Sequence, residues 1–393
     1  FMRRFSDLPA METEGESHNS NEPQSSAASP SNFALRCSGC GAKVGSTILD
    51  RALRRIQQNS PRPDSRPLIG LDAPDDAAVI QVPSGLALVQ TIDYFPALLN
   101  DPFLFGQIST QHALSDLFAM GAQPHSALAL ATIPYGAPAQ VEETLYQLLA
   151  GATRGLAQAN ASLIGGHTIE GPNLAFGLAC NGFADPDRLL RKGGMQPGQA
   201  LILTKAIGTG TLFAAQMRLQ AKGRWIEGAV ASMLLSNQAA ATCFLAHGAT
   251  ACTDITGFGL LGHLLEMVRA SGVAVELELE AIPWLEGALE TVQRGIVSSL
   301  QPQNSQAAAA IANLTQASRR PHFPLLFDPQ TSGGLLASVP VPQANACVAA
   351  LQSLGYGQSA IVGYTISRPT IEDSVSVNDQ DSATDSDQPI TIA

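Results

Sequence analysis

The chain has 393 residues, 45% of them apolar, and 33 acidic residues outnumber 22 Lys and Arg to give a net charge of −11. This length and apolar content suffice for a substantial core in two or three domains. The acidic balance argues against binding to nucleic acid or to an anionic membrane surface, since both need clustered cations. It is compatible with a metal-dependent site, because carboxylates are ligands for hard cations.

The six cysteines are too sparse for a disulfide framework. With no signal-peptide pattern and no long apolar run near the start, they indicate a reducing, cytoplasmic location. Four of them lie in apolar stretches and are typical of small core residues: Cys180, Cys243, Cys252 and Cys347.

Both ends of the chain are predicted to be disordered. Residues 1–35 include a Ser-, Asn-, Glu- and Pro-rich linker, and residues 370–393 form an acidic tail rich in Asp and Ser. The chain opens on Phe1, so it is expected to be a fragment or to start at a cloning boundary. A fusion to an upstream redox domain is our hypothesis.

The first motif is "CSGCGAK", with Cys37 and Cys40 three residues apart. A structural zinc site needs four ligands, and no second Cys-x-x-Cys pair follows. A thioredoxin-like pair opens a helix after a strand, whereas here a linker precedes it. The remaining alternatives are a reactive thiol at Cys40, with Lys43 favouring its thiolate or meeting a phosphate, and an incidental thiol in a mobile segment.

The next elements alternate strands and helices up to a turn-rich break at 191–199. Strand 86–93 ends on Asp93, and helix 101–121 has Asp101 as N-cap and Pro102 in its first turn. After the break a second block of similar length begins, and we expect an N-terminal domain over 36–190 and a C-terminal domain over 191–369. The other expected elements are strands 125–134, 161–166 and 174–184 with helix 138–159, then strands 200–205, 249–255, 273–280 and 333–339 with helices near 228–247 and from 258.

Acidic residues gather at the ends of these elements. Asp75 and Asp76 precede a strand, Asp93 and Asp254 end strands, and Asp116 shares a helix face with Ser109 and His112. Convergent carboxylates would bind Mg²⁺ carrying a polyphosphate. Each Asp alone is about as well explained as a helix cap or a solvated charge.

Four glycine-rich turns, at 164–172, 204–212, 253–263 and 328–336, form the second feature. Glycines let backbone N–H groups approach phosphate oxygens. None of the four is a Walker A sequence or a dinucleotide fingerprint, and each alone is more often a turn. Together with the carboxylates they favour a nucleotide.

These stretches resemble, in order, the selenophosphate synthetase family over residues 36–368: "GCGAK", "DDAAV", "TIDYFPALLNDPFLFGQIS", "ALSDLFAMGAQP", "GGHTIEGP", "TKAIGTG", "DITGFGLLGHL" and "DPQTSGGLL". The resemblance implies the two-domain α+β fold shared with aminoimidazole ribonucleotide synthetase. N-terminal strands of two subunits would form a dimeric β-barrel, and the C-terminal domain would be an α/β sandwich. The implied reaction converts ATP, selenide and water into selenophosphate, AMP and phosphate.

The resemblance also implies roles for individual residues. Cys40 and Lys43 match the catalytic pair, and Gly166, His167 and Thr168 match a segment that reaches ATP across the dimer interface. Mg²⁺, with K⁺ as a further candidate ion, would act with ATP. The implied metal ligands are Asp76, Asp93, Asp116 and Asp254, and the implied ATP contacts also include Lys43, Ala73, Pro74, Asp75, Asp93 and Asp116.

Three positions depart from the family pattern. His112 replaces a frequent Asn, Pro74 replaces a frequent basic residue, and Ala42 replaces a second cysteine of some members. The alternatives are another ATP-using enzyme of the same fold, such as an aminoimidazole ribonucleotide synthetase, and a non-catalytic selenium or metal carrier that uses Cys37 and Cys40.

Overall fold

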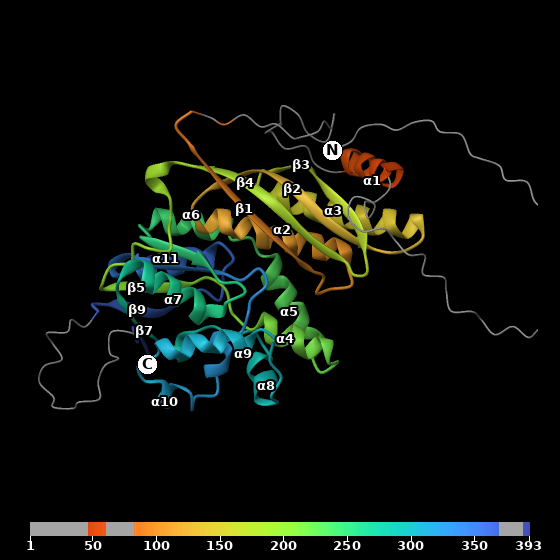
Figure 1. The fold of residues 1–393 in the computed structure, drawn as a ribbon. Helices are drawn as coiled ribbons and strands as arrows, with labels where there is room; N and C mark the ends of the chain where they lie inside the picture. Colours follow the sequence, from red (N-terminus) through yellow and green to blue (C-terminus); the bar gives the residue numbers. More distant parts are fainter. Residues whose placement is uncertain (1–45, 60–81, 83, 369–387) are drawn as a thin grey trace, which may run out of the picture.

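The computed structural model describes residues 46–59, 82, 84–368 and 388–393, with the side chains of 46–50 excepted. Within this part of the chain, two β-sheets carry the fold, and helices pack on and between them (Figure 1).

The N-terminal sheet has the order β1-β4-β2-β3. β4 is antiparallel to both β1 and β2, and β2 is parallel to β3. Two helices pack against this sheet, α2 (Pro102–Ala119) and α3 (Pro138–Gln158). The strands are β1 (Ala87–Pro96), β2 (Gln123–Pro134), β3 (Ser162–Gly171) and β4 (Ala175–Ala184).

Glycines bring α2 and α3 into backbone contact. A Cβ on Gly106 would lie 2.2 Å from the Leu148 carbonyl oxygen, and one on Gly151 would lie 2.0 Å from that of Phe103. No real side chain tolerates such distances, so both positions require glycine. The close approach fixes α2 between the sheet and the C-terminal half of the molecule (Figure 1).

The predicted start and end of α2 are confirmed. Asp101 accepts a hydrogen bond from Leu104 N at 3.0 Å, and Pro102 is the first helical residue. Gly121, at φ +72°, follows the C-cap Met120. These local signals act within one helical turn, which is why the sequence alone predicts them.

One helix of the N-terminal half was not predicted, α1 (Ser46–Asn59). It begins inside residues 36–48, the segment with Cys40 and Lys43 that the sequence predicts to be mobile. It packs on α3, with Arg51 Nε 2.5 Å from Glu142 Oε2 and the Arg55 guanidinium 3.5 Å from the centre of the Tyr146 ring. Contacts with a helix almost a hundred residues away therefore support this short segment.

The C-terminal sheet has the order β10-β7-β9-β5-β8-β6 and is antiparallel except for the β10–β7 pair. Its strands are β5 (Gln199–Leu203), β6 (Ala251–Asp254), β7 (Ala274–Leu277), β8 (Leu335–Pro340), β9 (Ala360–Ile366) and β10 (Ile390–Ile392). The helices of this half are α4 (Thr209–Met217), α5 (Gly223–Leu234), α6 (Gln238–Ala246), α7 (Gly259–Ser271), α8 (Ala288–Gln293), α9 (Gln301–Asn304), α10 (Leu314–Ala317) and α11 (Val341–Ser353).

The continuous apolar run of β5 reflects burial on both faces of the sheet. Ala200 and Ile202 pack into a core that extends to α2, α3, α6 and α11. Leu201 and Leu203 pack into a second core with α7. Because the first core contains residues from both sheets, the two halves of the molecule are joined by apolar packing.

Two predictions about the C-terminal half were wrong. The single helix expected near 228–247 is divided into α5 and α6 around Asn237, whose Nδ2 donates to Ser115 Oγ and to the Gly333 carbonyl, each at 2.9 Å. The tail predicted to be disordered over 370–393 ends in strand β10. Ile390 and Ile392 are buried against β7, so the last residues are anchored by the sheet, whereas 369–387 lie outside the described residues.

Among the described helices, none is by itself long and apolar enough to span a bilayer; only α5 and α6 taken together, across a bend of 57°, meet that test.

Candidate active site between the two sheets

Three of the predicted acidic residues gather where α2 meets the edge strands of both sheets. Asp93 lies on the half-buried face of β1, Asp116 on α2, and Asp254 at the end of β6. Burial and then the charge of Asp116 raise the pKa of Asp93 to about 6. The same two causes hold the pKa of Asp254 well above its usual value, against an opposing hydrogen bond from Ser115. The three carboxyl groups therefore repel one another in one region.

The hydrogen bonds of this region leave carboxylate oxygens available. Thr91 Oγ1 donates to Asp116 Oδ2 at 2.5 Å, which orients that carboxylate. Asp254 Oδ2 is buried without a hydrogen-bond partner among the described residues. A buried anionic oxygen without a partner is costly, so it fits a cation better than it fits an apolar core.

The carboxylates are too far apart to enclose one ion. In the described part of the chain, the only group of three ligand atoms close enough for that is Cys243, His247 and Cys347. Asp93, Asp116 and Asp254 would therefore act on more than one ion, each of which would take its other ligands from the oxygens of a polyphosphate.

His112 occupies the middle of this region in a defined tautomer. Its Nδ1 accepts a hydrogen bond from Ser332 N at 2.9 Å, so Nε2 carries the proton and faces Asp93 Oδ2 at 3.9 Å. Burial is the main cause that lowers its pKa to about 4. The side chain is therefore neutral near pH 7 and offers one N–H donor, as the amide of Asn would.

Lys205 is a site residue that the sequence analysis missed. It lies two residues after β5, in "TKAIGTG", and is only 3% exposed. Its Nζ donates to the carbonyl oxygens of Leu235 at 2.5 Å and Ser332 at 3.2 Å. Burial lowers its pKa to about 7, while the charge of Asp254 opposes that shift. The signal that the sequence offered for this residue was a lysine at the end of the expected apolar strand 200–205.

Two of the glycine-rich turns bind each other instead of remaining open. Gln330 Oε1 accepts from Gly208 N at 2.9 Å, Thr209 N at 3.1 Å and Thr209 Oγ1 at 3.0 Å. Asp328 Oδ1 accepts from Thr211 Oγ1 at 2.7 Å. The backbone donors at 208 and 209, which the sequence offered to a phosphate, are already satisfied by a side chain.

The glycines of these turns are explained by packing. A Cβ on Gly210 would lie 2.4 Å from the Pro329 carbonyl oxygen, one on Gly333 would lie 2.1 Å from that of Ile255, and one on Gly334 would lie 2.7 Å from Lys205 N. The turns at 204–212, 253–263 and 328–336 therefore pack tightly against one another, and this packing holds Asp254 and Lys205 in position.

The structure does not bring the predicted "GGHT" contacts to the acidic residues within one chain. Gly166, His167 and Thr168 lie on β3, at the opposite edge of the N-terminal sheet from β1. His167 is exposed. A Cβ on Gly166 would lie 2.2 Å from the Ala129 carbonyl oxygen, so strand pairing by itself requires this glycine.

The remaining predicted residues lie outside the described part of the chain, and their roles stay predictions: Cys40, Lys43, Ala73, Pro74, Asp75 and Asp76.

Comparisons with known proteins identify the fold and the family. Residues 74–184 match the N-terminal domain, and residues 196–375 the C-terminal domain, of AIR synthase related proteins. The predicted domain boundary near residue 190 falls between the two matches and stays a proposal.

Solved structures share the fold at low identity. Thiamine-monophosphate kinase from Stenotrophomonas maltophilia has a TM-score of 0.62 at 18% identity, covering 89% of this chain and 97% of that one. The hydrogenase maturation protein HypE of E. coli has a TM-score of 0.60 at 17% identity, covering 82% and 91%.

Sequence relatives are much more similar. The "Selenide, water dikinase" of Pelobacter propionicus is 39% identical over 85% of this chain and 95% of its own length. That of Clostridioides difficile is 35% identical over 84% and 93%. The predicted two-domain α+β fold is thereby confirmed, and the chain belongs to the AIR synthase related family and, within it, to the selenide, water dikinases.

Proposed function

We propose that this chain uses ATP to phosphorylate selenide, yielding selenophosphate, AMP and phosphate. The proposal is supported by relatives named selenide, water dikinase that match almost their whole length. The structural observation that carries it is the group of Asp93, Asp116 and Asp254. Burial and then the charge of Asp116 raise the pKa of Asp93 and of Asp254, and Asp254 Oδ2 has no hydrogen-bond partner among the described residues.

Mg²⁺ is the cation that this donor set fits, because hard divalent cations prefer carboxylate oxygens. Asp93, Asp116 and Asp254 would hold two or more such ions between them, with Asp76 as a further ligand carried over from the sequence motif. When bound, Mg²⁺ neutralises the charge of the polyphosphate and aligns it for in-line transfer. K⁺ is kept as a candidate further ion, with no residue assigned to it.

The chain's own residues would then position the reactants. Thr91 fixes the Asp116 carboxylate, and the Nε2–H of neutral His112 offers a donor to an anionic oxygen. From the motif alone, we assign Cys40 to position hydroselenide for its attack on the γ-phosphate, without forming an S–Se bond, and Lys43 to reduce repulsion between selenide and that phosphate. Water would then cleave the remaining diphosphate to AMP. This thiol chemistry suits a reducing, cytoplasmic setting.

A homodimer is part of the proposal, supported by an exposed apolar face on the N-terminal sheet. β1 alternates strictly, and its outward residues Leu88, Ile92 and Tyr94 are 40%, 62% and 48% exposed. Such a face favours burial against a second copy. A partner sheet placed there would form the barrel, and His167 at the far edge would be available to a neighbouring site.

Phosphorus NMR of ATP and selenide mixed with the protein tests the function. We expect a selenophosphate signal together with AMP and phosphate. ATP turnover that ignores selenide, or turnover with formylglycinamidine ribonucleotide instead, would contradict the proposal. Asp254→Asn should abolish the signal, whereas His112→Asn, which retains a neutral N–H donor, is the matched control and should keep it.

A further inference from the structure

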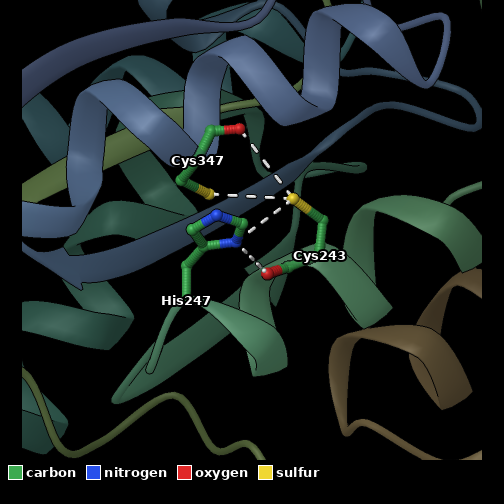
Figure 2. Close-up of side chains that lie close together, drawn as sticks. All are labelled: Cys243, His247 and Cys347. Atoms are coloured by element: carbon green, nitrogen blue, oxygen red, sulfur yellow. Dashed lines mark hydrogen bonds between the residues drawn. The ribbon is translucent and has the colours of Figure 1, made fainter.

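Three soft or borderline metal ligands meet at the junction of α6 and α11, apart from the acidic residues. Cys243 and His247 lie four residues apart at the end of α6, and Cys347 comes from α11 (Figure 2). Figure 2 shows the imidazole edge turned toward both sulfur atoms. None of the three is among the causes that shift the pKa of Asp93 or Asp254.

The distances suit a tetrahedral ion. The two sulfur atoms are 4.0 Å apart, and Cys243 Sγ lies 3.6 Å from His247 Nδ1. All three ligand atoms lie within 4.8 Å of one another. A tetrahedral zinc ion with usual bond lengths places two sulfurs about 3.8 Å apart and a sulfur and a nitrogen about 3.6 Å apart. The two distances from Cys243 Sγ are therefore within a few tenths of an ångström of binding geometry.

The surroundings separate this group from ordinary core cysteines. Cys252 is equally buried, but its sulfur reaches only the Thr253 carbonyl oxygen among described residues. Cys243 and Cys347 are 5% and 0% exposed, whereas His247 is half-buried. Two thiolates and an imidazole select thiophilic cations over Mg²⁺, so this group and the acidic residues would take different ions.

Protonation would link binding to pH. Burial raises the pKa of Cys243 and raises that of Cys347 to about 12, so both thiols are neutral without a cation. In the metal-free state, His247 Nδ1–H donates to the Cys243 carbonyl oxygen at 2.8 Å. Binding at Nδ1 moves that proton to Nε2, and each thiol releases one, so two protons leave for each ion.

We propose that Cys243, His247 and Cys347 form a zinc site that crosslinks α6 and α11, with water as the fourth ligand. Three protein ligands with an open position are typical of zinc sites that keep a bound water. The site is independent of the proposed kinase reaction.

Zinc binding by the full chain in a Cys37→Ala/Cys40→Ala background tests the proposal, because that background removes the N-terminal thiols. The reduced, metal-free protein is titrated with ZnCl₂, and bound metal is measured after gel filtration. Released protons are counted with a pH indicator. We expect one Zn²⁺ per chain and two protons per ion. Co²⁺ should give the visible absorption of a tetrahedral thiolate site.

Two further variants separate loss of the site from loss of the fold. His247→Gln changes a half-buried residue and should weaken zinc binding at least about tenfold while circular dichroism stays unchanged. Cys347→Ala should abolish binding, and Cys180→Ala, at a buried cysteine outside the cluster, should retain it. Equal zinc binding by His247→Gln and its parent would overturn the proposal. So would a loss of two mass units on mild oxidation that zinc does not prevent, because that result marks the sulfurs as a disulfide pair.

Discussion

The acidic site and the cysteine–histidine cluster bring candidate metal ligands together in two different ways. The acidic site draws Asp93, Asp116 and Asp254 from both halves of the molecule, and their charges repel one another until a cation arrives. The cluster uses neutral thiols within one half, and its atoms already lie near tetrahedral spacing. In the acidic site, binding of the metal–nucleotide complex would relieve the repulsion between the carboxylates. In the cluster, the thiols are neutral without a metal ion, so no such repulsion exists.

The largest expected effect is on turnover at the acidic site. Asp254→Asn keeps the shape of the side chain but removes a charge from the proposed Mg²⁺ ligands. We expect selenophosphate formation to fall at least about 100-fold, as when a single preorganised electrostatic group is removed. Cys347→Ala, in the other region, should leave turnover within about threefold of the parent, and a similar loss in both variants would break the comparison.

The glycine-rich turns should show the next effect. Gln330→Ala removes the acceptor for three donors on residues 208 and 209. These donors lie in the packed turns that hold the acidic site in position. Leaving buried donors unpaired should lower the free energy of unfolding by about 2–4 kcal/mol. Urea unfolding measures it. Gln352→Ala, on α11 with its amide 3.4 Å from the Ser359 carbonyl oxygen, is the control and should cost less than about 1 kcal/mol.

The acidic site should also oppose stability in a pH-dependent way. The folded-state pKa of Asp254 lies above its ordinary value of 3.8, so folding takes up a proton and the metal-free protein loses stability as pH rises through that interval. Asp254→Asn should therefore be more stable than its parent without metal, by about 1–3 kcal/mol at pH 8 and by less at pH 4.

The difference between variant and parent is the quantity to measure in that experiment. His112 titrates in the opposite sense, because its lowered pKa makes stability rise with pH between about 4 and 6.5. Thermal unfolding of both proteins at several pH values, without metal, cancels that contribution. A difference that does not change with pH would contradict the predicted repulsion.

A last effect, similar in size to the preceding one, should distinguish the ions. With a nonhydrolysable ATP analogue bound, Mg²⁺ should raise the melting temperature of the parent and of Cys347→Ala but not that of Asp254→Asn. Zn²⁺ should raise that of the parent and of Asp254→Asn but not of Cys347→Ala. A stabilisation of about 2–3 kcal/mol is expected near a hundredfold excess over the dissociation constant. If either ion lost its stabilising effect in both variants, the two regions would not bind different ions, and the comparison would fail.

Local signals in the sequence predicted much of the fold. The Asp101 cap and the apolar run of β5 each act within a few residues, and the structure has both. A strand at 86–93 was also expected, but as a buried strand, whereas β1 alternates between half-buried and exposed residues. Asp93, Asp116 and Asp254 were also identified from the sequence, but only Asp254 ends its strand, whereas Asp93 lies inside β1, which continues to Pro96. These features need only the geometry of a single helix or strand.

Features that depend on distant contacts were missed. Gln330 satisfies donors 122 and 121 positions earlier in the chain, and Asn237 divides a predicted helix because Ser115 and Gly333 bind its side chain. Lys205 became a site residue only through burial beside Asp254. The cysteine–histidine cluster joins residues 104 positions apart, so spacing along the chain gave no sign of it.

The central claim is that carboxylates from β1, α2 and β6 hold the metal–nucleotide complex together. Anomalous diffraction from Mn²⁺ in crystals grown with a nonhydrolysable ATP analogue tests it most directly. We expect manganese peaks within bonding distance of Asp93, Asp116 and Asp254, with the triphosphate between them. Manganese and nucleotide bound elsewhere, with these three carboxylates unliganded, would contradict the account.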